Sequence, residues 1–236
     1  MTLLLMAGTG EARELAEGLA ARGRDFTVWL PEGARITREW RGSAQGGPLG
    51  RCLEVAAPRM VLDASHPFDV EGSHLAARHC AARGLPYLLL RRPEWRAGPG
   101  DDWHRVASDA EAARLIAPGS TVLVASGREG LAAYARLERC RILCRQIGDP
   151  GVPFPLPNGD WLIQRPPFSV EEEIALFREL GIDWLVLRNA GSARAETKLI
   201  AARTLGLRVA MIARPAPPDA PMAQTVAAAL AWVDAA

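Results

Sequence analysis

The chain begins with the apolar run Leu3–Ala7, which passes directly into the turn Gly8-Thr9-Gly10-Glu11 and then into a helical pattern. A nucleotide-binding strand–turn–helix unit begins in this way. The glycines let the backbone approach a pyrophosphate, and the helix start offers unpaired N–H groups and the positive end of its dipole. Gly8, Thr9, Gly10 and Glu11 are therefore candidate dinucleotide contacts. Arg13 stands where the fingerprint has its third glycine, so an ordinary tight turn explains this segment equally well.

Charge and length exclude several classes of function. The 236 residues can bury one large core or two small ones, and the net charge of +1 without a basic block argues against nucleic acid as a partner. No apolar stretch approaches the length of a membrane span, and we expect a cytoplasmic protein. The four cysteines have no zinc or redox spacing, and the histidines have no metal-ligand spacing, so buried thiols and no metal are expected.

Short apolar runs alternate with helical patterns, which predicts an α/β fold with largely parallel sheets. The expected strands lie near 2–7, 26–31, 60–64, 86–91, 120–125, 140–147, 160–164, 184–188 and 207–212. These are many strands for one small sheet, and the irregular stretch 92–101 indicates a seam. We expect two Rossmann-like domains, 1–95 and 96–236, with a cleft between them. Capping boxes mark helix starts at Ser108 and Ser169, and the tail 223–235 predicts an outer helix.

Polar residues that follow the strands are the candidates for chemistry, because ligands of open parallel sheets bind at the carboxyl ends of the strands. Similar junctions occur at Gly8–Glu11, Asp63–Phe68, Ser126–Glu129, Gln164–Ser169 and Arg188–Ser192. Together they favour a ligand-binding edge over simple helix capping, although Ser169 is explained by capping alone.

Within these junctions, His66 precedes a proline that holds it out of the next helix, so it could donate a proton or bind a ligand carbonyl; a structural role is about as frequent. Arg128, Arg165 and Arg188 each follow a strand, where guanidinium groups suit phosphates and carboxylates; surface ion pairs are the alternative. Lys198 is the only lysine among 28 basic residues, which suggests a place where a compact ammonium is needed, or chance.

No familiar catalytic motif is complete in this chain. The tyrosine–lysine pair of short-chain dehydrogenases, the nucleophile elbow and the phosphate loop ending in glycine-lysine are all missing from the sequence. Hydride transfer is compatible with this lack, because the cofactor carries the difficult chemistry and the protein mainly orients two bound molecules.

Taken together, the segments resemble the precorrin-6A reductase family of cobalamin biosynthesis. The matching pieces span nearly the whole chain in order: Gly8–Ala12, Asp63-Ala64-Ser65-His66-Pro67-Phe68, Pro86-Tyr87, Arg91–Trp95, Ser126-Gly127-Arg128, Arg165–Ser169, Arg188–Gly191 and Lys198-Leu199. The resemblance implies two Rossmann-like domains with the active site between them. It also implies transfer of a hydride from a reduced nicotinamide dinucleotide to a double bond of the tetrapyrrole precorrin-6A, which gives precorrin-6B.

Residue roles follow from the resemblance. It assigns Gly8, Thr9, Gly10 and Glu11 to the cofactor, with further cofactor contacts at Ser65, Gly127, Arg128 and Lys198. His66 is expected at the reacting region, and Arg165, Arg188 and Asn189 are expected to bind the substrate, which carries many carboxylates. The resemblance also suggests neighbouring enzymes of the cobalamin pathway as partners, and neither nucleic acid nor a membrane is expected.

The expected cofactor is NADPH, because Arg35 and Arg38 follow the second strand; Glu32, just beyond that strand, leaves NADH open. The alternatives are a cobalt-precorrin-6A reductase that uses NADH, another nicotinamide-dependent reductase or nucleotide-sugar enzyme, and a non-catalytic dinucleotide sensor.

Overall fold

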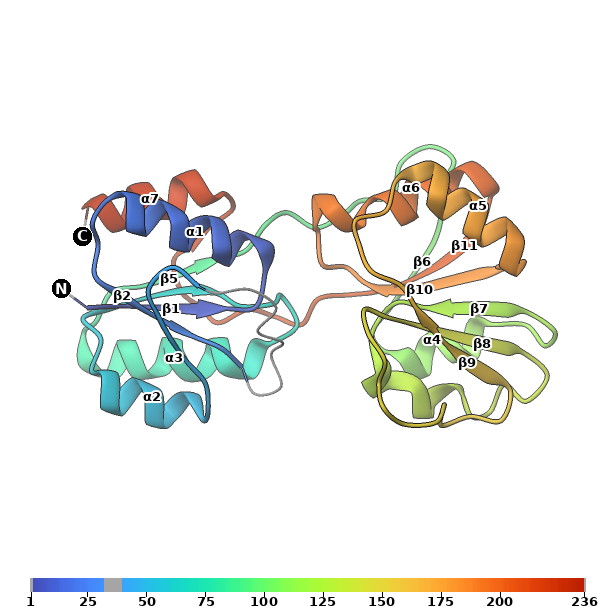
Figure 1. The fold of residues 1–236 in the computed structure, drawn as a ribbon, viewed down its shortest axis with the longest axis horizontal. Coiled ribbons are helices and arrows are strands. Elements are labelled where there is room, and N and C mark those ends of the chain that lie inside the picture. Colours follow the sequence, from blue (N-terminus) through green and yellow to red (C-terminus); the bar gives the residue numbers. More distant parts are fainter. Residues whose placement is uncertain (1, 32–39, 236) are drawn as a thin grey trace. The chain divides into compact units, whose positions relative to one another are not determined.

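The computed structural model describes residues 2–31 and 40–235, which form two compact units. The first contains residues up to Pro93 together with Pro215 onward, and the second contains Glu94–Arg214. Each unit has one six-stranded sheet in which every described strand pair is parallel, which confirms the α/β fold class. Figure 1 shows the strands and helices of each unit.

The sheet of the first unit has the order β12-β5-β4-β1-β2-β3. Its strands are β1 (Leu3–Ala7), β2 (Phe26–Trp29), β3 (Ser43–Gln45), β4 (Met60–Ala64), β5 (Tyr87–Leu90) and β12 (Met222–Ala223). Helices α1 (Gly10–Ala21) and α7 (Val226–Ala235) cover one face, and α2 (Leu49–Ala56) and α3 (Val70–Arg83) cover the other (Figure 1). Strands buried on both faces read as continuous apolar runs, which explains the sequence of β1.

Successive residues of β1 therefore enter different cores. Leu3 and Leu5 belong to the cluster with Leu15 of α1 and Leu230 of α7, whereas Leu4 lies in the cluster with α2 and α3. This alternation follows from the two-residue period of a strand. It fixes the register of β1 at the centre of the sheet, and with it the position of the turn that follows.

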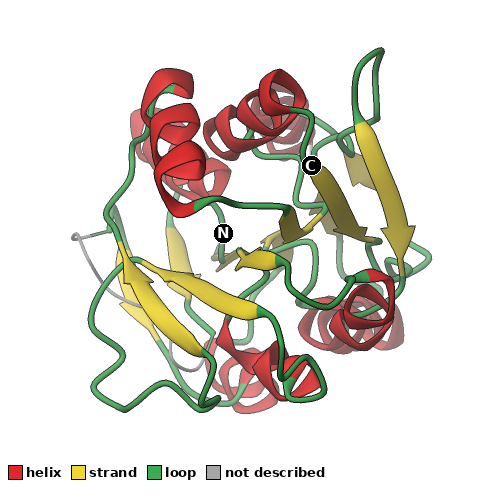
Figure 2. Cartoon of the chain, turned by 90° about the vertical axis from the view of Figure 1, so that its right-hand side faces the viewer, coloured by secondary structure: helices red, strands yellow, loops and turns green. Residues whose placement is uncertain are grey.

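The second sheet has the order β6-β11-β10-β7-β8-β9. Its strands are β6 (Asp102–Val106), β7 (Thr121–Val124), β8 (Arg141–Gln146), β9 (Gly159–Ile163), β10 (Trp184–Arg188) and β11 (Arg208–Ile212). Its helices are α4 (Asp109–Leu115), α5 (Val170–Leu180) and α6 (Thr197–Leu205), with 3-10 helices at Arg128–Tyr134 and Ala193–Ala195. Helices lie on both faces of the sheet (Figure 2).

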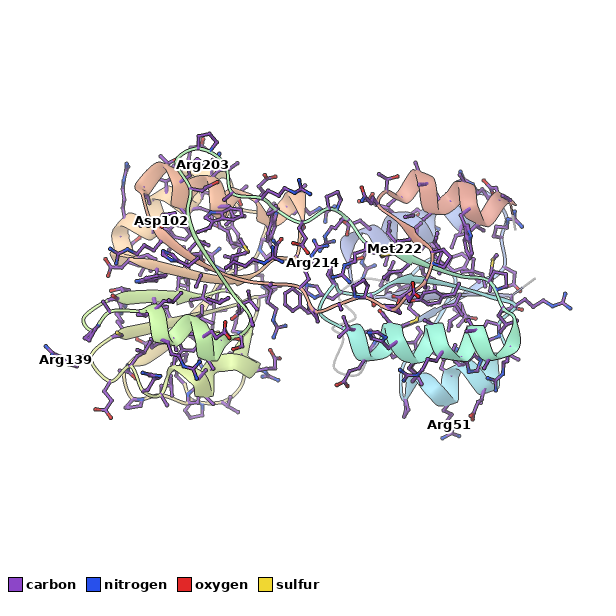
Figure 3. All side chains as sticks on the ribbon, turned by 180° about the vertical axis from the view of Figure 1, so that it is seen from behind. Arg51, Asp102, Arg139, Arg203, Arg214 and Met222 are labelled. Carbon is purple, nitrogen blue, oxygen red and sulfur yellow. The ribbon has the colours of Figure 1, made fainter. Side chains whose placement is uncertain are left out.

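The tail corrects the expected domain boundary. Residues 96–236 were expected to form the second domain, but β12 pairs with β5 through Met222 and Leu89, and α7 packs on α1 in the first unit. Leu230 lies where any side chain at Gly18 would clash, so the two helices approach closely. Figure 3 labels Met222 on this returning segment. The small residues of α7 thus form an internal helix contact rather than an outer layer of the second domain.

Three strands, β3, β6 and β12, were not predicted from the sequence. Strand β3 consists of Ser-Ala-Gln, β12 has two residues after a proline, and β6 (Asp-Trp-His-Arg-Val) has only one fully buried residue. All three are edge strands, which need no continuous apolar run because one side lacks a neighbour. The expected helix starts are confirmed, because Ser108 and Ser169 each accept a hydrogen bond from the backbone three residues on.

All four cysteines are buried, as expected. Burial raises the pKa of the Cys80 thiol to about 11. No helix within residues 2–31 and 40–235 has the combined length and apolar character of a membrane span.

Candidate active site

In each sheet, the order in which the chain adds strands reverses at one place, so that later strands lie on the other side of the first. In the first sheet this topological switch point lies between β1 and β4, and in the second between β7 and β10. Ligands of open α/β sheets bind outside the carboxyl ends of the strands at such points. Of the predicted junctions, Gly8–Glu11 and Asp63–Phe68 flank the first switch point, and Ser126–Glu129 and Arg188–Ser192 flank the second.

The Gly8–Glu11 turn is held in place by Thr9. Its hydroxyl donates to the carbonyl of Ala64 at the end of β4 (2.9 Å) and accepts from the N–H of Ala12 (3.2 Å), so Thr9 is the N-cap of α1. A methyl group at Gly8 would come within 2.7 Å of the backbone nitrogen of His66. The two turns of the first switch point therefore touch, and only glycine permits that approach.

The space above Gly10 is open. A side-chain carbon there would meet no atom within 4 Å, and Gly8 and Gly10 are both exposed. The first N–H groups of a helix have no acceptor within it, and in α1 Thr9 takes only that of Ala12. The N–H groups of Gly10 and Glu11 therefore have no acceptor within α1 and lie at the positive end of the helix dipole. This donor set fits a pyrophosphate.

Glu11 forms an ion pair with Arg92, just beyond β5. The Glu11 side chain is 27% exposed and that of Arg92 is 12% exposed. A lone carboxylate beside a phosphate site would repel the ligand, and the pair offsets that charge. Arg92 was visible in the sequence as an arginine after a strand, but it was given no role there.

The Asp63–Phe68 turn is built around a buried carboxylate. Asp63 is fully buried and accepts from the N–H of Ser65 (2.9 Å) and the hydroxyl of Tyr87 (2.7 Å). Burial, and then the charge of Asp63 and the hydrogen bond to it, raise the pKa of Tyr87, so its hydroxyl stays a donor. Ser65 is itself buried, with its hydroxyl 3.2 Å from that of Ser73.

His66 is half-buried in this turn. Its Nδ1 accepts from the N–H of Phe68 (3.3 Å), so the neutral ring carries its proton on Nε2. It lines a small cavity at the ends of β4 and β5 together with Ser65 and Arg91. A larger cavity of about 550 Å³ lies beside α3 and the start of β5, between Arg78 and Pro221, and contains none of the predicted site residues.

In the second unit, hydrogen bonds to Asp109 hold the Ser126-Gly127-Arg128 turn in place. Its Oδ1 accepts from the hydroxyls of Ser126 (2.7 Å) and Tyr134 (2.7 Å). Gly127 has φ of 107°, which a side chain strongly disfavours. Arg128 is exposed and makes no ion pair or hydrogen bond with the described residues. No sequence signal connected Asp109 with this turn, because the contact is formed only by the fold.

The three residues predicted to bind the substrate differ in solvent exposure and in hydrogen bonding. Arg165 is exposed after β9, and Arg188 is half-buried, with its Nη2 3.9 Å from a carboxylate oxygen of Glu129. Asn189 is 5% exposed, and its side chain accepts from the N–H of Trp95 (2.9 Å) and donates to the Trp95 carbonyl (3.0 Å). The Asn189 amide therefore holds the beginning of the second unit.

Lys198, in the first turn of α6, lies within the electrostatic reach of Arg145 and Glu173. Those two residues form a bidentate ion pair with both nitrogen–oxygen distances at 2.7 Å. Burial, and then the charge of Arg145, lower the pKa of Lys198, while Glu173 opposes them. Glu32, Arg35 and Arg38, on which the choice between NADPH and NADH depended, lie outside the described residues.

Residues 2–234 match the family model described as "Precorrin-6x reductase CbiJ/CobK". The chain belongs to this precorrin-6x reductase family. Membership makes it an oxidoreductase and implies a nicotinamide cofactor and a tetrapyrrole substrate. The expected family is thus confirmed.

The relatives of this reductase match most of its length. It is 40% identical to a precorrin-6A reductase of Rhodococcus erythropolis, with 98% of this chain and 96% of the relative covered. It is 27% identical to a cobalt-precorrin-6A reductase of Priestia megaterium, with 90% of each covered. A solved structure titled "CobK precorrin-6A reductase" superposes with a TM-score of 0.92 at 32% identity and covers 100% of this chain and 96% of that one.

Proposed function

We propose that this reductase transfers a hydride from NADPH to a double bond of precorrin-6A in cobalamin biosynthesis. The observation that carries the proposal is the open Gly8–Glu11 turn at a topological switch point, in a chain whose relatives at 35–40% identity are precorrin-6A reductases. The relatives named for the cobalt-containing substrate are less similar, at 26–27% identity. This difference favours the cobalt-free macrocycle.

The N–H groups of Gly10 and Glu11 would hold the pyrophosphate, with Gly8 and Thr9 shaping the turn. When bound, the nicotinamide supplies the hydride. Ser65 would act through the turn it builds, because its own hydroxyl is buried against Ser73. Gly127, Arg128 and Lys198 are further cofactor contacts in this proposal.

Reduction of a carbon–carbon double bond needs a proton as well as a hydride. We assign the proton to His66, whose neutral ring carries its proton on Nε2 because Nδ1 accepts from the N–H of Phe68. Arg165 and Arg188 would bind substrate carboxylates through their guanidinium groups. Asn189 is proposed as a positioning residue instead of a substrate contact, because Trp95 occupies both ends of its amide.

The test is oxidation of NADPH and of NADH by the purified protein, with precorrin-6A, cobalt-precorrin-6A or neither present, followed by mass analysis of the pigment. The proposal predicts a product two hydrogens heavier, formed with NADPH and the cobalt-free macrocycle. Faster turnover of the cobalt form with NADH would support the alternative reductase. Tight NADPH binding without turnover of either macrocycle would overturn the assignment of substrate.

A further inference from the structure

The direction of the His66 ring is set by the backbone of its own turn. The His66 carbonyl accepts from the N–H of Asp69 (2.7 Å), and Nδ1 accepts from the N–H of Phe68 (3.3 Å). The turn also packs against Gly8, where a methyl group would come within 2.7 Å of the His66 backbone nitrogen. The position of Nε2 therefore depends on how firmly the Asp63–Phe68 turn is held.

Two buried serines connect this turn to α3. The hydroxyl of Ser73, in α3, donates to the carbonyl of Asp69 (3.2 Å), which uses its one hydrogen. The hydroxyl of Ser65 lies 3.2 Å from that of Ser73, so Ser65 is the donor between the two. The residue before His66 is thus bonded to the helix that follows the turn.

Tyr87, in β5, joins the strand before the turn to the same helix. Its hydroxyl donates to Oδ2 of Asp63 (2.7 Å) and lies 3.4 Å from the carbonyl of Ser73. The other oxygen of Asp63 accepts from the N–H of Ser65 (2.9 Å). Asp63 is 0% exposed and Tyr87 is 6% exposed, so water does not compete for these bonds. One phenol hydroxyl therefore connects both ends of the turn that carries His66.

We propose that Tyr87 is a positioning residue for the reduction and that it aims His66 through Asp63 and Ser65. A proton donor is effective only when it is held close to the productive geometry. Tyr87 supplies no proton itself, because Asp63 holds its hydroxyl hydrogen. The role of His66 as proton donor rests on the proposed function, whereas its positioning belongs to the turn and is measured without substrate.

The first test is Tyr87→Phe, which removes the hydroxyl and keeps the ring. With NADPH and precorrin-6A, kcat should fall about tenfold or more, because the ring of His66 is no longer held in one direction. The KM for NADPH should change less than about twofold, because the N–H groups proposed for the pyrophosphate belong to α1. An unchanged kcat would overturn the proposal.

Val233→Ala is the control for a loss of stability alone. Val233 is 1% exposed in α7, so the truncation leaves a cavity in the core of the first unit. Its carbonyl accepts from Arg24, just before β2, and it therefore lies at the amino end of the sheet, away from the turn. This variant should unfold more readily than the wild type and keep its kcat. Equal decreases in kcat for Val233→Ala and Tyr87→Phe would overturn the proposal.

A double-mutant cycle tests whether Tyr87 acts through His66. In a His66→Ala background, Tyr87→Phe should change kcat by less than about twofold, because no imidazole is left to aim. The same loss in both backgrounds would show that Tyr87 acts by another route, and would overturn the proposal.

NMR of protein labelled with ¹⁵N-histidine gives a measurement that needs no substrate. At a pH where the ring is neutral, the nitrogen shifts of wild-type His66, assigned with His66→Gln, should show one tautomer with its hydrogen on Nε2. In Tyr87→Phe the two nitrogen shifts should move toward each other as the second tautomer is populated. His104, in the second unit, serves as the internal reference.

Ser73→Ala breaks the same network at a smaller side chain and should move the His66 shifts in the same direction, so the test stands even if Tyr87→Phe does not fold. Unchanged His66 shifts in the folded variants would overturn the positioning role. If the wild type does not reduce precorrin-6A, or if His66→Ala keeps the wild-type kcat, the proposed function fails in its substrate or its proton donor. The nitrogen shifts then decide the positioning role alone.

Discussion

The two units arrange five of their strands in the same order, β5-β4-β1-β2-β3 and β11-β10-β7-β8-β9, but they differ at the switch point. In the first, β1 leads through an open glycine turn into the twelve-residue helix α1, and the Glu11 carboxylate in its first turn is paired with Arg92. In the second, β7 leads into a 3-10 helix, and the surrounding junctions carry Arg128, Arg165 and Lys198. The same scaffold thus offers backbone donors in one unit and cationic side chains in the other, and fold alone does not decide which.

A second comparison concerns the turns themselves. The only two tyrosines of the chain each donate to an aspartate that fastens a junction, Tyr87 to Asp63 and Tyr134 to Asp109, both at 2.7 Å. In the first unit the aspartate lies on the strand before the turn, and in the second it begins a helix beside the turn. The two turns therefore use the same tyrosine–aspartate hydrogen bond, with the aspartate on a strand in one unit and on a helix in the other.

The largest effect should come from breaking the buried Arg145–Glu173 ion pair of the second unit. Glu173→Gln leaves the Arg145 charge buried and uncompensated, which should lower the free energy of unfolding by about 3–5 kcal/mol. Urea denaturation measures it. Glu17→Gln breaks an exposed pair with Arg41 in the first unit and should cost about 0–1 kcal/mol. Similar decreases in the free energy of unfolding for Glu173→Gln and Glu17→Gln would show that burial does not make the Arg145–Glu173 pair more important for stability.

The tyrosine–aspartate pairs should make similar contributions in the two units. Tyr87→Phe removes a hydrogen bond to the buried Asp63 carboxylate, and Tyr134→Phe removes one to the half-buried Asp109 carboxylate; each should lower the free energy of unfolding by roughly 1.5–3 kcal/mol. Thermal and urea unfolding of both variants provide the comparison. If only one of them loses stability, the two turns are not fastened in equivalent ways.

A charge at the glycine turn should act on the cofactor and leave the fold intact. Gly10→Asp places a carboxylate at the proposed pyrophosphate site and should weaken NADPH binding by about 1–2 kcal/mol, roughly tenfold or more. Binding is followed by NADPH fluorescence. Gly10→Ala, where the added carbon meets no atom within 4 Å, should bind normally. Gly50→Asp puts the same charge at the start of α2, again in open space, and serves as the matched control.

The smallest expected effect on stability concerns two ion pairs, one beside the edge strand β6 of the second unit and one on α7, which returns to the first unit. Asp101, before β6, pairs with Arg203 of α6 (2.7 Å; Arg203 is labelled in Figure 3), and Asp234 of α7 pairs with Arg22 (3.1 Å). Burial alone would raise the pKa of Asp101, but hydrogen bonds from Arg203 and Gly98 hold it below its usual value. The hydrogen bond from Arg22 likewise lowers the pKa of Asp234.

A carboxyl whose pKa is depressed by folding adds stability above its unfolded pKa of about 3.9, and this stability is lost as pH falls through the folded pKa. Asp101→Asn should therefore lower Tm slightly at pH 7, and the difference from the wild type should shrink and then disappear as the pH falls through the lowered pKa of folded Asp101. Asp234→Asn should show a smaller effect, because its side chain is 45% exposed. A pH-independent difference would contradict the electrostatic explanation.

Central strands and capped helices could be predicted from the sequence because their signals are local. Leu3–Ala7 is apolar throughout since both faces of β1 are buried, and Thr9 and Ser169 cap helices within a few residues. Edge strands such as β6 lack that signal. The return of the tail to the first unit depends on packing between α7 and α1, which no local pattern encodes.

The residues of the candidate site also fall into two groups, those that the sequence could indicate and those whose role depends on the fold. Its glycines and exposed arginines follow strands and were visible in the sequence. Asn189 was assigned to the substrate because its position after β10 is suggestive, whereas its contacts with Trp95 depend on residues far apart in the chain. The Arg145–Glu173 pair was missed for the same reason, since a strand and a helix meet there only in the folded unit.

The central claim is that the cofactor delivers its hydride directly to the macrocycle on this protein. NADPH carrying deuterium at the transferable position of C4 tests it in a single anaerobic turnover with precorrin-6A, analysed by mass spectrometry. The account predicts one deuterium in the reduced pigment, at a carbon that does not exchange with solvent. A product that gains both hydrogens from water, with the deuterium left on the oxidised cofactor or lost to solvent, would contradict it.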